Sequence, residues 1–276
     1  MAKKKQQTAQ SKLIGEHPTS GLFFDWFECE DTPATDNKKH RKLTNKGLSS
    51  ATLVDHLSQW ILKHHATDAR LARIDRKKQI LDKHGFAKYM EGKVPFPVKS
   101  ATTQKGNLGE IILAEYLSST SGLEVLVYKL RYNPNVEQSM KGDDLLLFEK
   151  QSVQDKVIMG EAKFRSTKSK QALDDIVDSL STKNLPISLT FVCDRLEEMG
   201  EVDLADEIDD LISNLHSNKT PVIYVGFYHS EATAHKTIEK NLNSSNKNLV
   251  IVSYCEDNPA KLVKDSFNEA INMVMK

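Results

Sequence analysis

The chain has 276 residues, enough to bury a full core as one large domain or as a domain with an appendage. Apolar residues make up 39% and charged residues 28%, as in ordinary globular proteins. Because no apolar run approaches the ~20 residues of a membrane span and the lysine-rich start lacks an apolar core, we expect neither a membrane protein nor a signal peptide. The three cysteines stand far apart and offer neither a disulfide framework nor a CxxC metal motif, so we expect a cytoplasmic protein.

Charge is balanced overall but unevenly distributed. With 38 basic and 38 acidic residues, the net charge of zero argues against nucleic-acid binding by bulk charge alone. Basic clusters occur at residues 3–5, 38–42 and 70–88, whereas residues 194–210 carry nine acids and one arginine. A basic side could contact phosphates locally. Each cluster could equally be the solvated face of a helix.

The first third of the chain has the composition of a tail and a helical region. Residues 1–18 are predicted to be a disordered basic tail. The aromatic segment 21–29 predicts a strand, and the polar segment 30–45 a loop. Apolar residues at helical spacing follow, around 53–61 and 70–83. Because Val94-Pro95-Phe96-Pro97 cannot continue a helix, it marks the end of a mainly helical region over residues 19–97.

The remaining residues, 98–276, predict one α/β domain. A buried helix is expected over 108–117, strands over 123–130, 144–148, 156–164, 221–228 and 249–255, and amphipathic helices around 173–180 and 204–215. A last helix is expected to begin at Asn258-Pro259, a cap residue followed by proline at the first helical position. This order predicts a sandwich of helices around a mixed sheet.

The most informative string is Gly160-Glu161-Ala162-Lys163, at the end of an expected strand. Alternate side chains of a strand share a face, so Glu161 and Lys163 should point the same way. A carboxylate beside an amine could supply a metal ligand and a neighbouring cation. Charged pairs are also common on exposed strands, so this string alone is weak evidence.

Two further acids strengthen the case for a site. Gly142-Asp143-Asp144 begins the preceding strand, and a hairpin would bring it to Glu161, forming an oxygen-rich site of the kind that Mg²⁺ prefers. Gly-Asp-Asp is also a common turn. Glu110, expected near the start of the buried helix, shares a face with apolar residues, where an unpaired charge is costly and a metal would offset that cost. A helix dipole alone could also explain an early acid.

Helix Glu, strand Asp, strand Glu-x-Lys and a following helix together resemble the core of the PD-(D/E)XK nuclease superfamily. The resemblance implies that Asp144 and Glu161 bind Mg²⁺ or Mn²⁺ together with the Ala162 carbonyl. It also implies that Lys163 positions or activates the attacking water and that Glu110 assists at the metal. Two departures are that no proline precedes the Asp and that the doubled Asp143-Asp144 leaves the ligand ambiguous. We favour Asp144, because Gly-x-Asp is the commoner form of the motif.

Three strings, KGNLGE (105–110), KGDD (141–144) and GEAK (160–163), resemble the HamA family, nuclease subunits of the bacterial Hachiman anti-phage system. The likeness covers roughly residues 95–275 and, more loosely, the helical region before them. It implies a metal-dependent DNA nuclease restrained by HamB, a superfamily 2 helicase. The alternative is a DNA-binding or scaffold subunit that keeps the fold but has lost cleavage.

Overall fold

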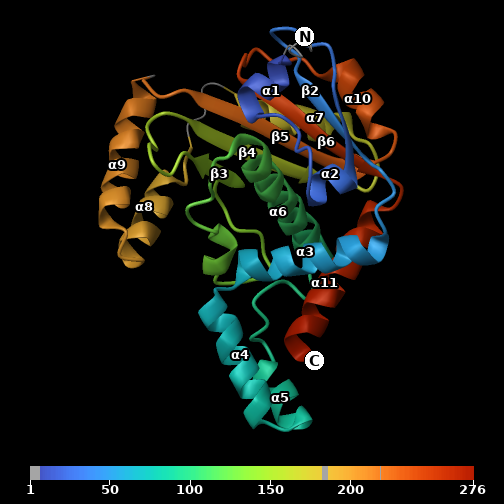
Figure 1. Cartoon of the computed structure of the whole chain (residues 1–276), viewed down its shortest axis with the longest axis vertical. Helices are drawn as coiled ribbons and strands as arrows, with labels where there is room; N and C mark the ends of the chain where they lie inside the picture. The colour runs from blue at the N-terminus through green and yellow to red at the C-terminus, as the bar shows by residue number, and fades with distance from the viewer. Residues whose placement is uncertain (1–6, 182–185, 218) are drawn as a thin grey trace.

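The computed structural model describes residues 7–181, 186–217 and 219–276, which form a six-stranded mixed β-sheet with helices on both faces (Figure 1). The strands run in the spatial order β1-β2-β6-β5-β4-β3. The outer pairs β1–β2 and β3–β4 are antiparallel, and the four strands between β1 and β3 are parallel to one another. Their bounds are β1 Phe27–Asp31, β2 His40–Asn45, β3 Leu145–Phe148, β4 Val157–Phe164, β5 Val222–Glu231 and β6 Leu249–Glu256.

Helices cover the sheet as two layers, each with its own apolar core. The α-helices are α1 Ala9–Ile14, α2 Leu22–Trp26, α3 Ser50–His65, α4 Asp68–Ile80, α5 Lys83–Met90, α6 Ala101–Ser121, α7 Lys170–Ser179, α8 Leu189–Glu198, α9 Val202–His216, α10 Ala234–Asn241 and α11 Pro259–Met275, with a 3₁₀ helix, η1, at Lys129–Tyr132. Side chains of α1, α2, α3, α6 and α11 form the core on one face, and those of α7 to α10 form the core on the other. This confirms the predicted mixed α/β sandwich.

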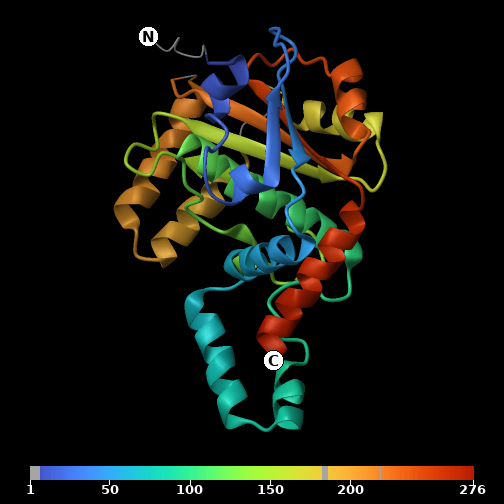
Figure 2. The same ribbon diagram turned by 45° about the vertical axis from the view of Figure 1, so that its right-hand side comes forward.

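Helices α4 and α5 extend away from the sheet, as both views show (Figures 1 and 2). A small apolar set holds this pair together: Ile74, Phe86 and Met90 are buried, while Leu71 and Leu81 are half-buried. Most other side chains of the two helices are exposed.

The second half of the chain follows the prediction closely. Strands β3, β4, β5 and β6 and helices α7, α9 and α11 lie where the hydrophobic patterns placed them. The last helix begins at Pro259, and the side chain of Asn258 accepts a hydrogen bond from the backbone N–H of Lys261, as expected of a cap. One predicted strand, residues 123–130, is wrong: this segment forms only an isolated bridge between Glu124 and Phe148 and then enters η1.

The first third of the chain departs most from expectation. Part of the predicted disordered tail is helix α1, whose Ile14 is fully buried. The predicted strand at 21–29 is instead helix α2 followed by the first three residues of β1, and the predicted loop at 30–45 contains the last two residues of β1 and all of β2. Residues 19–97 therefore contribute three substantial helices and also two strands of the common sheet, since β2 pairs with β6.

None of the helices that the structure describes is long and apolar enough to cross a membrane.

Candidate active site

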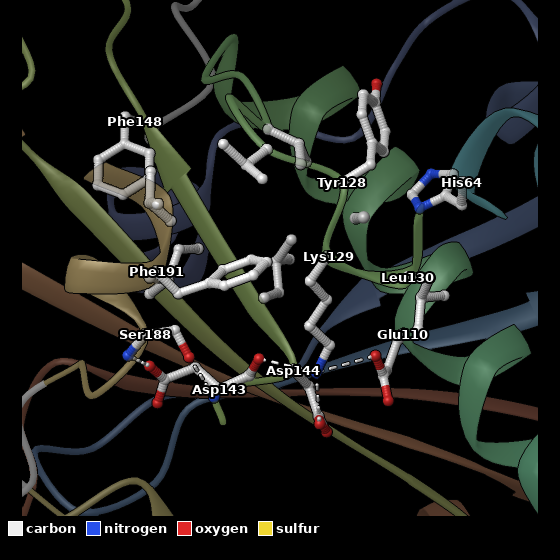
Figure 3. A pocket seen from close by; sticks show the side chains of 16 residues that line it. His64, Glu110, Tyr128, Lys129, Leu130, Asp143, Asp144, Phe148, Ser188 and Phe191 are labelled. Atoms are coloured by element: carbon white, nitrogen blue, oxygen red, sulfur yellow. Dashed lines mark hydrogen bonds and ion pairs between the residues drawn. The ribbon is translucent and has the colours of Figure 1, made fainter. Parts of the chain in front are cut away.

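Side chains from α6, η1 and the β3–β4 hairpin converge on one pocket (Figure 3). Its polar lining includes Glu110, Lys129, Asp143 and Asp144, and its apolar wall comes from β3, α8 and the segment before η1. Three of these four were considered from sequence. Lys129 was not.

Glu110 reaches the pocket from the third turn of α6, because the helix begins at Ala101. The expectation that Glu110 lies near the start of the helix is therefore wrong, and the helix dipole does not account for an acid there. Close packing of α6 on β4 brings it to the hairpin: a side chain at Gly160 would lie 2.9 Å from Leu113 Cδ2. Only 13% of the Glu110 side chain is exposed.

The two adjacent aspartates have different partners. Asp143 is buried; its backbone N–H donates to Ser188 Oγ, and its Oδ2 accepts from the Ser188 N–H, both at 2.8 Å. Asp144 instead accepts from the backbone N–H of Ala162 through Oδ2 at 2.9 Å. Gly142 makes this turn with φ +110°, a conformation that other residues rarely adopt. Asp143 is thus engaged in holding the turn to α8, whereas Asp144 faces the charged groups, an arrangement that favours Asp144 as the ligand.

Lys129 lies between the helix and the hairpin. Its Nζ is 3.2 Å from Glu110 Oε2 and 3.5 Å from Asp144 Oδ1, and it donates to the Asp143 carbonyl at 2.8 Å (Figure 3). Burial lowers the pKa of Lys129, but the two carboxylates more than offset this and leave the pKa above its ordinary value. Lys129 is therefore an ammonium that neutralises part of the acid cluster.

Glu161 and Lys163 form an ion pair on β4, on the same side of the strand as predicted. Strand pairing places Leu145 opposite Gly160, so Asp144 lies next to Glu161. Burial and the nearby Asp144 raise the pKa of Glu161 despite the pair with Lys163. Burial lowers the pKa of Lys163, but Glu161 and Asp144 more than compensate, so that Lys163 keeps its proton near neutral pH.

Glu110 carries the strongest electrostatic perturbation of the cluster. Burial, then the charge of Asp144, raises its pKa to about 8, although Lys129 acts in the opposite direction. No hydrogen bond in the described part of the chain reaches Glu110 Oε2, because the nearby Lys129 Nζ makes an ion pair without hydrogen-bond geometry. This buried carboxylate oxygen has the Lys129 ammonium beside it but no hydrogen-bond donor, so it is free to accept a further cation or a proton.

A divalent metal fits this donor set in chemistry. Carboxylate and carbonyl oxygens are the ligands that Mg²⁺ and Mn²⁺ take, and the orphaned oxygen of Glu110 would gain a partner. Within residues 7–181, 186–217 and 219–276, however, no three His, Cys, Asp or Glu side chains stand close enough together to form a metal-binding group as they are. In the arrangement described, Lys129 and Lys163 supply the positive charge.

The four predicted residues Glu110, Asp144, Glu161 and Lys163 thus lie together at one end of the β3–β4 hairpin, with the Ala162 backbone bound to Asp144. Their catalytic and metal-binding roles stay predictions. Lys129 was missed because it lies near the end of a segment, residues 123–130, that the sequence predicts to be a strand.

Comparisons of the sequence with known proteins place the chain that forms this fold in a defined family. The HamA family model matches residues 21–270. The Hachiman protein HamA of Bacillus cereus is 41% identical over 264 residues, covering 95% of this chain and 96% of that protein. The chain therefore belongs to the HamA family.

Proposed function

We propose that the chain is a metal-dependent endodeoxyribonuclease, the effector of a Hachiman anti-phage defence system, with a PD-(D/E)XK-type site. The proximity of Glu110, Asp144 and Glu161 to two lysines supports this most directly. Few structural roles require three carboxylates in one largely buried cluster, because gathering like charges out of water raises the free energy of the folded chain. The similarity to the Hachiman protein HamA supports the defence role.

Each residue has a distinct proposed role. Asp144, Glu161 and the Ala162 carbonyl would hold Mg²⁺ or Mn²⁺, with Glu110 assisting. The ion would supply charge neutralisation for the phosphate and a nucleophilic hydroxide near neutral pH. Because Lys163 retains its proton, its proposed part is to orient the attacking water and to attract the phosphate, not to accept a proton.

The proposal includes a helicase partner that restrains cleavage, a HamB-like protein of superfamily 2. The acidic hairpin, α8 with α9, is our candidate docking surface. All nine acids between residues 194 and 210 are exposed, and a surface of this charge would repel DNA. The aromatic segment near Trp26 is a weaker candidate, because Phe23, Trp26 and Phe27 are buried and Phe24 is the exposed ring of the four.

A plasmid assay tests the function. Purified protein is incubated with supercoiled DNA, with Mg²⁺ or EDTA, and with or without a HamB-like helicase. We expect Mg²⁺-dependent nicking that the helicase restrains. The alternative, an inactive DNA-binding or scaffold subunit, predicts no nicking under any condition and no binding of Mn²⁺ in calorimetry.

A further inference from the structure

The helical pair formed by α4 and α5, residues 68–90, is the most basic surface element of a chain with no net charge. It contains seven Lys and Arg residues and three Asp residues. We call it the basic arm, because it extends from the body in both views (Figures 1 and 2).

The basic side chains of the arm lack acidic partners. None of the seven takes part in an ion pair within the described residues, whereas basic groups on the body such as Arg41, Lys42 and Lys63 are paired with acids. Burial and the neighbouring Arg73 guanidinium lower the pKa of Arg70. The arm therefore carries a net positive charge, seven basic against three acidic residues, and none of its basic groups forms an ion pair within the described residues.

The charge is presented to solvent in an ordered way. Ile74, buried on one side of α4, packs toward α5 and the body. Arg73, Arg76 and Lys77 are exposed, and their i, i+3, i+4 spacing places them together on another side of the helix. With 13 residues, α4 is about 20 Å long, a length over which duplex DNA carries roughly 12 phosphates.

The root of the arm adjoins the candidate active site. Helix α3 ends at His65, two residues before the Thr67 cap of α4, and His64 lines the pocket that contains Glu110. Arg131, in the same 3₁₀ turn as Lys129, donates to the Lys63 carbonyl from Nε at 3.0 Å and from Nη2 at 2.8 Å. A polyanion bound along the arm would thus be held beside the pocket.

We propose that the basic arm binds the phosphate backbone of duplex DNA and holds it next to the acid cluster. The inference deepens the proposed function, on which its choice of DNA as the polyanion rests. Unpaired charge, helical spacing and the root beside the pocket favour a nucleic acid over an acidic protein. Because the chain is neutral overall, its affinity for DNA should depend on this local surface.

The test removes three charges from the arm and three from the opposite end of the molecule. The arm variant is R73Q/R76Q/K77Q. The control is K12Q/K236Q/K240Q on α1 and α10, which lie at the other end in Figure 1; these lysines are also exposed and have no ion pair within the described residues. Binding to a fluorescent 30-base-pair duplex is followed by anisotropy in EDTA at several salt concentrations, after circular dichroism has shown that each variant is folded.

Each phosphate contact that is removed should lower the magnitude of the slope of log affinity against log salt concentration by about 0.9. For the arm variant, the slope should therefore decrease in magnitude by about 2.7, and the affinity for the duplex should fall at least about tenfold. The control should bind like wild type. Three outcomes would overturn the inference: wild type does not bind the duplex, the control loses as much affinity as the arm variant, or the arm variant keeps the slope and affinity of wild type. In the last case an acidic protein would remain as the partner of the arm. If wild type binds through the arm yet does not cleave in Mg²⁺, the nuclease function fails while the arm assignment stands.

Discussion

Replacement of Lys129 by methionine should destabilise the protein strongly in the absence of metal. The ammonium lies 3.2 Å from Glu110 and 3.5 Å from Asp144, and its own side chain is 13% exposed. At pH 9, above the raised pKa of Glu110, the Glu110 carboxyl is ionised, and at an effective dielectric constant of about 20 each attraction is worth roughly 5 kcal/mol. Relief of the desolvation of the ammonium offsets several kcal/mol, so we expect a net loss of about 3–5 kcal/mol in the free energy of unfolding.

Urea unfolding in EDTA at pH 9 measures this effect, with the fluorescence of the fully buried Trp26 as the main reporter of the core. The matched control is the double variant Glu110→Gln/Lys129→Met, in which one uncompensated carboxylate is also removed. Because the two side chains interact directly, the double variant should be more stable than the sum of the single effects predicts, by about 1–3 kcal/mol. Mg²⁺ should raise the melting temperature of Lys129→Met more than that of wild type.

A loss below about 1 kcal/mol in Lys129→Met, the value of an exposed pair, would refute the account of Lys129 as the buried counter-ion of the cluster. Strict additivity in the double variant would do the same. A smaller Mg²⁺ effect in Lys129→Met than in wild type would show that the ion does not bind between these carboxylates.

Three further predictions concern turnover, partner binding and pH. Lys163→Ala should keep metal and DNA binding, but its turnover should fall by on the order of a hundredfold or more. Lys163→Arg should be nearly as impaired, because a planar guanidinium cannot replace a compact ammonium. Single-turnover cleavage rates, measured together with DNA affinity, test both expectations. Reversing the charges of Glu197, Glu198 and Glu201 should weaken the complex with the helicase and leave cleavage by the free protein unchanged, and a pull-down with undiminished helicase would remove the acidic hairpin from the interface. Burial, assisted by the charge of His235, lowers the pKa of His40 to about 3. The free energy of unfolding should therefore be highest above the ordinary histidine pKa of about 6.5 and fall by up to ~1.4 kcal/mol per pH unit from there toward pH 3. In urea unfolding, His40→Gln, which can retain the bond to Ser253, should lose less stability over this pH range than wild type; an equal loss would show that His40 is not the titrating group.

The hairpin that carries the motif was predictable because its signals are local. Strand β4 has buried residues at Val157, Ile158 and Met159, and its side chains become half-buried only at Glu161 and Lys163. The apolar residues therefore predicted the strand, and the alternation of charged and apolar residues at its end predicted the site. The short connection between the two strands favoured a hairpin, and pairing in a hairpin brings Asp144 next to Glu161.

Other elements depend on contacts that local patterns do not reveal. Strand β2 is polar in sequence, yet Arg41 is buried because Asp31 on β1 pairs with it at 2.7 Å. The segment after Gly21 is aromatic and nearly alternating, a pattern typical of a strand. It forms helix α2 instead, in which Phe23 stacks against Trp26 and against Phe27 at the start of β1. Lys129 is one of two charged residues in an otherwise mainly apolar segment, and only the folded chain brings it to Glu110.

The central claim is tested most directly by cleavage of supercoiled plasmid. Purified wild type and Glu161→Gln are compared in the absence of the proposed helicase partner. The substitution keeps the size of the side chain and removes the charge that the proposed metal requires. We predict that wild type converts the plasmid to nicked and linear forms in Mg²⁺ and not in EDTA, and that Glu161→Gln leaves it supercoiled while remaining folded. Equal cleavage by the two proteins, or cleavage by wild type in EDTA, would contradict a metal-dependent site built on Glu161.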